Sequence, residues 1–451
     1  MSLYIIKTFP VLSHFNAILP LANALKKRNH TVIISGSRYF KNYIEGYNFE
    51  YEIDESGTQF NPFLYTSNPK RDKANDILFS QRSEPSFSAI DRQIKTQSRT
   101  HRNAYYIVDI HFMQNPAWVL QHGRRLSFFS TKVALDERKD FAPLTTCYIS
   151  KGLSGRLLVG YYWKSYYIKR YISQAFGKTK FPRKKILAEA CENAGIPSQA
   201  LQLRRCLYPS IKGIPEFILS PKAFDPSYIP TPYQFYVSGL PLAPVSHKAD
   251  DLTSLRYKLT SLRNRGAKIV YCSLGSMPRR YEKAGKFLVS VLDALKQCHW
   301  HLILVFPGIN RKALQRYADK LFVYDYVPQM EILPLVDVMI SHGGMNTIKE
   351  CIINEVPLLI YPGSRSSDQY GNAARVVMHG IGLKGEMGAD SPTMISKKVE
   401  TLLKDRNFKR ALIRMKKLIT NDIESTNGAL IVESVTSAIE RSGEISKAPK
   451  S

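Results

Sequence analysis

The chain has 451 residues, of which 64 are Lys or Arg and 37 are Asp or Glu, so its formal net charge at pH 7 is +27. This length suits two domains of ordinary size, and a hydrophobic content of 44% permits full cores. The six cysteines show neither a CxxC pair nor the spacing of metal ligands, and no apolar run reaches the ~18 to 20 residues of a membrane-spanning helix. These features exclude a disulfide scaffold, a cysteine-based metal site and a transmembrane protein.

The excess of basic residues predicts attraction to polyanions such as nucleic acid, anionic lipid headgroups or nucleotide substrates. Because no helix–turn–helix, zinc or RNA-binding signature accompanies it, we favour an anionic membrane surface or an anionic substrate and expect no nucleic acid. A solvated basic surface explains the charge equally well. Residues 2–9 are too short an apolar run for a secretion signal. With reduced thiols, we expect a cytoplasmic protein that at most binds a membrane peripherally.

The chain begins with a strand–helix–strand pattern. Residues 3–8 are typical of a buried strand, a loop is expected at 9–13, and a second strand opens at 30–35. The intervening helix has a core-facing stripe with Pro20 in its first turn, where a missing N–H is tolerated. That stripe consists of Ile18, Leu21, Ala22 and Leu25. This βαβ unit predicts a parallel sheet.

The rest of the N-terminal half is less regular. Residues 55–103 are polar and weakly periodic, so we expect a long excursion with short helices. Residues 152–185 alternate aromatic and basic side chains. The remaining expected elements are strands at 104–110, 126–129 and 216–220 and helices at 116–122 and 186–195.

A proline-rich stretch, 221–252, is typical of a linker between domains. The βα alternation resumes after it, and the last segment, 393–441, is helical with charged faces. The elements expected after the linker are strands at 268–274, 301–306 and 337–340 and helices at 283–297, 346–355 and 368–380. The whole pattern predicts an α/β fold with two units.

A phosphate-binding turn is predicted where the strand 337–340 gives way to the helix 346–355. The turn reads Ser341-His342-Gly343-Gly344. A phosphate there would meet free backbone N–H groups and the positive end of the helix dipole. His342 can add a donor, and the two glycines let the backbone come close.

Polar residues on the following helix extend this site. Asn346 or Thr347 can cap the helix or hold the ligand. Glu350 lies one turn further along the same face, where a carboxylate suits a ribose diol. Two more turns follow strand ends, the edge at which α/β sheets bind ligands. Gly275-Ser276 offers a second diphosphate cradle, and Asp368-Gln369 suits adjacent sugar hydroxyls.

His14 is the candidate general base. It lies in the turn Pro10-Val-Leu-Ser-His-Phe-Asn16, after the first strand, and histidine titrates near neutrality. Asp109 ends a later strand of the same predicted sheet and can orient the imidazole. His111 lies close by and is a rival for a role in proton relay.

The block from Val323 to Gly382 resembles the donor-binding signature of the UDP-sugar glycosyltransferases, which have two facing Rossmann-like domains, the GT-B architecture. The matching residues are Pro328-Gln329, His342-Gly343-Gly344, Asn346-Thr347, Glu350, Pro357, Pro362 and Asp368-Gln369. The resemblance is strong over most of the C-terminal half and limited to key points, such as His14 and Asp109, in the N-terminal half. It implies an α/β GT-B fold with a cleft between the domains.

The resemblance also implies roles for the site residues. Ser276 would contact the diphosphate, Tyr326-Val327-Pro328-Gln329 would bind uracil and ribose, and Asp368-Gln369 would contact the sugar. The donor is expected to be a UDP-sugar, UDP-glucose first, with no metal and no further cofactor, and no DxD motif is present. The sequence departs from the family pattern at three places. Tyr326 replaces the usual Trp, which concerns the preference for the nucleobase, and Ser13 replaces a common Gly in the motif of His14. The longer loop before Asp368 carries Arg365, which concerns the preference for the sugar. That arginine can meet a donor carboxylate or face water, and we favour water.

The expected domains are an N-terminal acceptor-binding domain at 1–235 and a C-terminal nucleotide-sugar-binding domain at 236–420. In the resembling family the last helix returns to the N-terminal domain, as expected here for 421–451. The expected function is inverting transfer of a hexose from a UDP-sugar to a lipophilic or phenolic hydroxylated acceptor. Residues 152–185 can bind an anionic membrane, wall the acceptor pocket or form a packed helix with a basic outer face. The alternatives are a UDP-sugar epimerase or hydrolase and a non-catalytic basic lipid or nucleic-acid binder.

Overall fold

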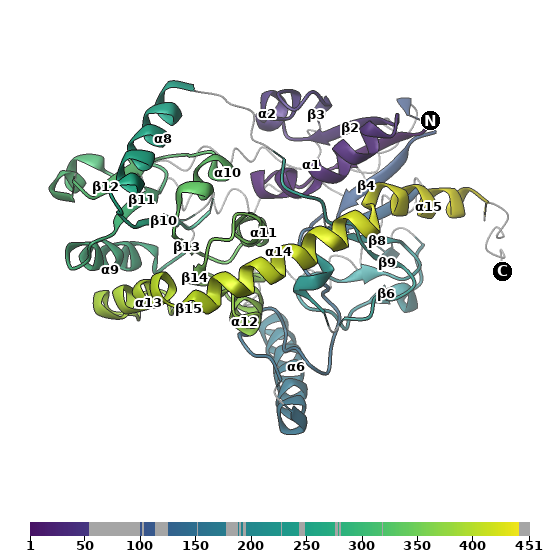
Figure 1. Ribbon diagram of the computed structural model, residues 1–451. Coiled ribbons are helices and arrows are strands. Elements are labelled where there is room, and N and C mark those ends of the chain that lie inside the picture. The colour runs from purple at the N-terminus through teal and green to yellow at the C-terminus, as the bar shows by residue number, and fades with distance from the viewer. Residues whose placement is uncertain are drawn as a thin grey trace.

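The computed structural model describes residues 1–53, 100–101, 103–112, 125–150, 152–176, 188, 191–192, 195–226, 228–242, 249–275, 278, 281–317 and 319–441. Two parallel sheets form its framework (Figure 1). Two expected segments lie largely or wholly outside the described residues: the excursion at 55–103 and the helix at 116–122. Most of the expected helix at 186–195 also lies outside them.

The first sheet has seven parallel strands in the order β3-β2-β1-β4-β5-β8-β9. In chain order its strands are β1 Leu3–Lys7, β2 Thr31–Gly36, β3 Glu50–Ile53, β4 Tyr105–Asp109, β5 Leu126–Ser130, β8 Glu216–Ile218 and β9 Gln234–Tyr236. β1 lies between β2 and β4, so the turns after β1 and β4 open side by side at one edge. A separate antiparallel pair joins β6 Leu201–Gln202 to β7 Ser210–Ile211.

The second sheet has six parallel strands in the order β12-β11-β10-β13-β14-β15. In chain order they are β10 Ile269–Ser273, β11 His301–Val305, β12 Leu321–Tyr324, β13 Val338–Ser341, β14 Leu358–Ile360 and β15 Gly382–Lys384. Successive residues of β10 face opposite sides, since Ile269 and Tyr271 join one apolar cluster and Val270 and Cys272 another. Both faces of this sheet are therefore buried, as expected for a parallel sheet.

Helices connect and cover the strands. They are α1 Leu12–Lys27, α2 Lys41–Glu45, α6 Gly152–Ala175, α8 Ala249–Asn264, α9 Ala284–Lys296, α10 Gln329–Ile332, α11 Met345–Ile353, α12 Gln369–Met378, α13 Pro392–Lys404, α14 Arg406–Thr426 and α15 Gly428–Arg441. Short 3₁₀ turns are η1 Arg38–Phe40, η2 Ser198–Ala200, η3 Lys222–Phe224, η5 Arg311–Tyr317 and η6 Leu333–Leu335. No helix in the described part of the chain is both long and apolar enough to cross a bilayer.

The C-terminal helices join the two halves. Figure 1 shows α14 running from the second sheet towards the first, and Asp422 on it accepts from the Ala223 N–H at 2.8 Å. α15 then packs on the first sheet and α1, burying Val432 in the same cluster as Tyr4 and Ile6. Its Glu433 binds Arg28 and His30.

Three local expectations were wrong. α1 begins at Leu12, so His14 lies in the first helical turn rather than in a loop, and Pro20 lies inside the helix. The proline-rich stretch is more than a linker, because it contains β9, which pairs with β8 at the edge of the first sheet. Edge strands tolerate nearby prolines since one side of the strand has no hydrogen-bonding partner strand.

Candidate active site

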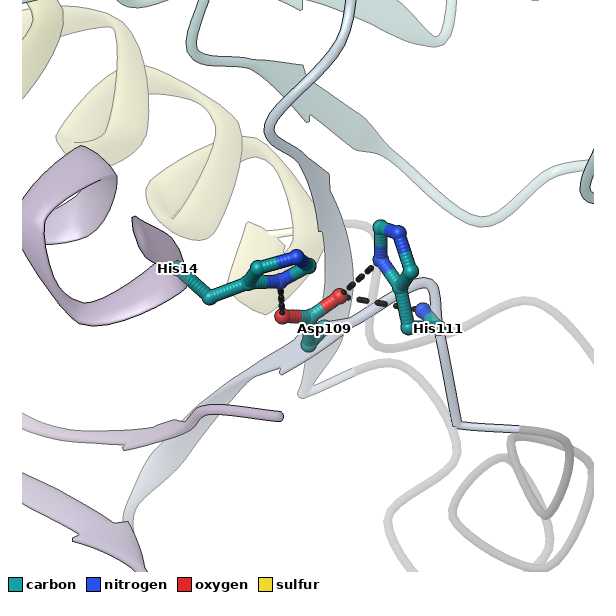
Figure 2. A group of neighbouring side chains, drawn as sticks. All are labelled: His14, Asp109 and His111. Carbon is teal, nitrogen blue, oxygen red and sulfur yellow. Dashed lines mark hydrogen bonds and ion pairs between the residues drawn. The ribbon is translucent and has the colours of Figure 1, made fainter. Parts of the chain in front are cut away.

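Asp109 receives hydrogen bonds from two histidines (Figure 2). His14 Nδ1 lies 2.6 Å from Asp109 Oδ2, and His111 Nδ1 lies 2.7 Å from Asp109 Oδ1. The backbone N–H groups of Phe9 and His111 also donate to this carboxylate, at 3.3 and 3.0 Å. Asp109 is fully buried and His14 is 7% exposed. The structure thus brings His14 and Asp109 together, as the sequence predicted, and adds His111 on the other carboxylate oxygen.

The electrostatics of the cluster separate the roles of its members. Burial would raise the pKa of the Asp109 carboxyl, but the two imidazoles hold it well below its usual value. Burial first, and then the neighbouring His14, lower the pKa of His111 to about 3. His111 is therefore neutral at physiological pH and a weak proton acceptor.

The arrangement leaves a base available on His14. Because Nδ1 lies against an ionised carboxylate, that nitrogen carries the proton and Nε2 carries the lone pair. In the described part of the chain, one group of side chains has ligand atoms close enough together to hold a metal ion. It consists of His14, Asp109 and His111, whose ligand atoms all lie within 4.8 Å of one another. The short Nδ1–oxygen distances fit hydrogen bonds instead, and these bonds occupy the Nδ1 atom of each histidine.

The turn after β13 has the geometry expected of an anion site. Gly343 has a φ of +91°, a conformation that favours glycine, and Gly344 is the N-cap of α11. No side chain caps this helix, so its first backbone N–H groups are available to a ligand. A Cβ on Gly275 or Gly344 would lie 2.7 or 2.8 Å from the His342 ring. Glycine at these positions therefore makes room for the imidazole.

His342 packs against an aromatic side chain. Its ring stacks on Tyr281 with centroids 6.0 Å apart. Burial lowers its pKa to about 4, so the ring is neutral at pH 7. Its Nδ1 is buried without a hydrogen-bonding partner among the described residues. A buried polar nitrogen of this kind fits an oxygen of a bound diphosphate.

The residues predicted for the nucleoside lie beside this turn. The Gln329 side-chain amide donates to the Glu350 carboxylate, and burial raises the pKa of Glu350 to about 7. Val327 is buried, whereas Tyr326 is 58% exposed, so one face of its ring is open to a ligand. Burial first, and then Tyr47 of the N-terminal half, raise the pKa of Tyr326. Tyr47 therefore lies close to Tyr326.

The predicted sugar-binding pair is tied into the protein. Asp368 accepts from Asn372 at 2.8 Å and forms an ion pair with Lys132 at 3.2 Å. Although burial opposes both charges, the pair lowers the pKa of Asp368 and raises that of Lys132. Gln369 accepts from the Gly363 and Ser364 N–H groups and donates to the Tyr281 hydroxyl at 2.9 Å, so both ends of its amide are engaged. Arg365 lies over the Tyr370 ring at 4.7 Å and is exposed.

Contacts between the two halves bring the histidine cluster close to the phosphate turn. The Asn346 amide, expected to cap α11 or bind ligand, donates to the Ser13 carbonyl at 2.6 Å, directly beside His14. Lys349 donates to the Leu219 carbonyl at 3.4 Å. Thr347 is half-buried in the first turn of α11. Ser276 lies outside the described residues, so its predicted role stays a prediction.

Sequence reasoning missed Lys132. This lysine follows β5. Its charge contributes to lowering the pKa values of His111 and His342, and Asp109 contributes to raising the pKa of Lys132. Its one sequence signal was its position after a strand of the first sheet, the edge that carries His14 and Asp109. Its partner, Asp368, comes from the other half of the chain, which no local pattern reveals.

With this geometry established, the chain can be compared with known proteins. The family model described as UDP-glucoronosyl and UDP-glucosyl transferase matches residues 236–423. This part of the chain belongs to that family. The match contains the phosphate turn, Glu350 and Asp368, and it confirms the resemblance predicted from the sequence.

Curated relatives of the family match only part of the chain. The demethyllactenocin mycarosyltransferase of Streptomyces fradiae is 28% identical over 34% of this chain and 32% of its own length. The zeaxanthin glucosyltransferase of Pantoea ananas is 28% identical over 37% of each chain. The matches thus span about a third of each relative.

The fold comparison covers the whole chain. The solved structure of the glycotransferase of kitacinnamycin superposes with a TM-score of 0.66 at 16% identity, over 96% of this chain and 99% of that one. At such low identity the likeness shows the fold alone. It confirms the predicted α/β architecture with two Rossmann-like domains, the GT-B fold.

Proposed function

We propose that this protein is an inverting glycosyltransferase that moves a hexose, glucose first among the candidates, from a UDP-sugar to a hydroxyl of a lipophilic or aromatic small molecule. The observation that carries the proposal is the buried His14–Asp109 pair, which meets the phosphate turn of the family domain through the Asn346–Ser13 hydrogen bond. Acceptor activation and donor binding are thereby brought to one cleft. In this proposal the acceptor binds to the N-terminal domain, 1–235, and the donor binds to the C-terminal domain, 236–420. The last segment, 421–451, returns to the N-terminal domain.

In this mechanism His14 Nε2 accepts the proton of the acceptor hydroxyl as that oxygen attacks the anomeric carbon. Asp109 orients the imidazole and stabilises the imidazolium that forms, since its carboxylate binds Nδ1 at 2.6 Å. A base on the acceptor's side of the sugar supports a single in-line displacement, which inverts the anomeric centre. The carbon–oxygen bond to the diphosphate breaks in the same step, and UDP leaves.

The leaving diphosphate would be stabilised without a metal ion. The N-terminus of α11 supplies backbone N–H groups and its dipole, and the unpartnered His342 Nδ1 supplies a further hydrogen-bonding group. Ser276 would add a hydroxyl. In our proposal Tyr326, Val327 and Gln329 bind uracil and Glu350 binds the ribose, while Asp368 and Gln369 contact the sugar.

Two observations support the acceptor class. Two of the curated relatives are named for demethyllactenocin and zeaxanthin, which supports a small-molecule acceptor. The aromatic rings of Phe9 and Tyr208 lie beside the histidine cluster, with Tyr208 4.1 Å from His111 between ring centroids. Such rings suit an apolar acceptor.

The test is UDP release from UDP-glucose, with and without a panel of lipophilic and phenolic alcohols. We expect release that depends on an acceptor and that falls by about 10²- to 10⁴-fold in His14→Ala. His299→Ala, which changes an exposed histidine on another surface, is the matched control and should retain the wild-type rate. No release with any acceptor, together with no binding of UDP, would refute the proposal.

A further inference from the structure

Helix α6 exposes an apolar face. Figure 1 shows this helix projecting from the body of the molecule. The side chains on its outer face are between 48% and 80% exposed. This outer face consists of Leu153, Leu157, Tyr161, Ile168, Tyr171 and Ile172. They recur at spacings of three, four or seven residues, which places them along one side of the helix.

The opposite face of α6 already has its packing partners. Val159 and Trp163 are 0% and 2% exposed, and the Trp163 indole donates to the Phe141 carbonyl at 2.9 Å. The Tyr166 hydroxyl accepts from the Leu207 N–H at 2.8 Å. The outer face is therefore not needed to hold the helix on the protein, and an exposed patch of this kind marks an interaction site.

Along the sequence, the charges within and next to α6 have a single sign. Residues 141–188 contain no Asp or Glu, and their ten basic residues are Lys151, Arg156, Lys164, Lys169, Arg170, Lys178, Lys180, Arg183, Lys184 and Lys185. Lys164 lies on the outer face itself, and Arg156 and Lys169 are exposed on its flanks. An apolar stripe with cations beside it is the pattern of a helix that lies in the interface of an anionic bilayer.

We propose that the outer face of α6 binds anionic lipid bilayers. The leucines and isoleucines would enter the boundary between acyl chains and headgroups, the tyrosines would lie at headgroup level, and the lysines and arginines would reach the phosphates. A second copy of the chain fits less well, because two such helices would bring like charges together on molecules of net charge +27. Nucleic acid leaves the apolar stripe without a partner.

The placement of α6 connects the bilayer to the candidate active site. From Tyr166 the chain of contacts passes to Leu207, to the adjoining Tyr208 and, between ring centroids 4.1 Å apart, to His111. α6 is therefore in contact with the segment that carries Tyr208, next to the histidine cluster. If the proposed transfer function holds, a membrane-dissolved alcohol would be the natural acceptor, but bilayer binding itself does not depend on that function.

The test is co-sedimentation of the full-length protein with phosphatidylcholine vesicles that contain or lack phosphatidylserine. We expect binding to the anionic vesicles, weakened by added salt. Leu157→Glu/Ile168→Glu should lower the apparent partition coefficient at least about tenfold. The matched control, Val289→Glu/Leu418→Glu, makes the same change in charge at residues that are 58% and 52% exposed on other helices, and should bind within about twofold of wild type.

Folding and self-association are checked in parallel. Circular dichroism and UDP binding should be unchanged in both double variants, since all four side chains are exposed. Failure of the wild type to bind anionic vesicles, or equal loss of binding in both variants, would overturn the proposal. So would a dimer, seen by analytical ultracentrifugation, that only the α6 variant abolishes. Vesicle binding without any glycosyl transfer would leave this proposal standing and refute the proposed function alone.

Discussion

Asp109 binds two adjacent histidines. Both imidazoles donate Nδ1–H to its carboxylate, and burial and the neighbouring His14 ring lower the pKa of His111 to about 3. An imidazole that stays neutral at physiological pH is a poor acceptor for the proton of the acceptor hydroxyl. His111 therefore acts as a hydrogen-bonding partner that helps to keep Asp109 ionised.

We predict different kinetic effects for substitutions at the two ends of this cluster. Asp109→Asn should lower acceptor-dependent turnover by about a hundredfold or more, because an amide no longer stabilises the imidazolium or fixes the tautomer of His14. His111→Gln keeps a donor near the Asp109 carboxylate and should cost less than about tenfold. Steady-state kinetics with UDP-glucose measure both. A larger loss in His111→Gln than in Asp109→Asn would make His111 the base.

Glu350 predicts a pH dependence of donor binding. Burial raises the pKa of this carboxyl to about 7, and only the ionised form can accept hydrogen bonds from both ribose hydroxyls. UDP affinity should therefore be nearly full at pH 8, about half of that at pH 7 and about tenfold lower at pH 6 than at pH 8. Isothermal titration calorimetry with UDP measures this. In Glu350→Gln the profile should be flat over this range, and an unchanged profile would assign the titration to another group.

The residues of the candidate site differ in how far sequence could predict them. His14 and Asp109 follow neighbouring parallel strands, so their proximity followed from the βα alternation alone. Glu350 and His342 lie within one strand–helix unit, where spacing fixes position. Lys132 could not be predicted, because its ion pair with Asp368 joins residues from the two halves of the chain.

At the scale of elements, α15 is the part that returns to the first sheet. Its Val432 is fully buried in the cluster of β1 and α1 residues. We predict that Val432→Ala lowers the free energy of unfolding by about 2 kcal/mol, because it removes two methyl groups and leaves a cavity. Val289→Ala, at a 58% exposed site on α9, should change stability by less than about 0.5 kcal/mol. Urea denaturation followed by circular dichroism measures both, and equal effects would argue against docking of α15.

The regular elements were predictable because their burial is periodic. The strands of both sheets carry apolar residues on both faces, and the helices between them carry a single apolar stripe. β9 escaped prediction because its three residues lie in a proline-rich stretch that looks like a linker. The exposure of the outer face of α6 could not be predicted either, because an exposed apolar stripe and a buried one have the same spacing along a helix.

At the scale of the whole molecule, the two halves share a hydrophobic core. One hydrophobic cluster runs continuously from Ile110 and Val133 near the first sheet to Ile303 and Met339 in the second. Beside it, Asp225 of the N-terminal half binds Arg375 of α12 at 2.9 Å and Arg138 at 2.5 Å. Both guanidinium groups also lie 4.2 Å from the Phe141 ring centroid. This buried charge cluster fixes α12, and hence Asp368 at its N-terminus, against the N-terminal half.

The cluster predicts how stability depends on pH. Burial opposes ionisation of Asp225, but the two arginines hold its pKa below the ordinary value. A carboxyl with a lowered pKa in the folded state stabilises the protein above the unfolded value of about 3.9, and this stabilisation is lost as the pH falls through the folded value. Asp225→Asn should therefore cost about 3 to 5 kcal/mol at pH 7, because it leaves the buried Arg375 guanidinium without a counter-charge and leaves Arg138 with Asp140 alone.

The difference between wild type and Asp225→Asn should start to shrink as the pH falls below about 4, because the unfolded wild-type carboxyl then binds a proton that the folded carboxyl binds only at its lower pKa. Asp325→Asn is the control: its ion pair with Arg311 is more than half exposed on both sides and should contribute less than about 1 kcal/mol at any pH. Urea denaturation between pH 7 and pH 3 measures all three proteins. A constant difference across that range would mean that Asp225 acts by packing or hydrogen bonding alone, and that the two halves do not depend on its charge.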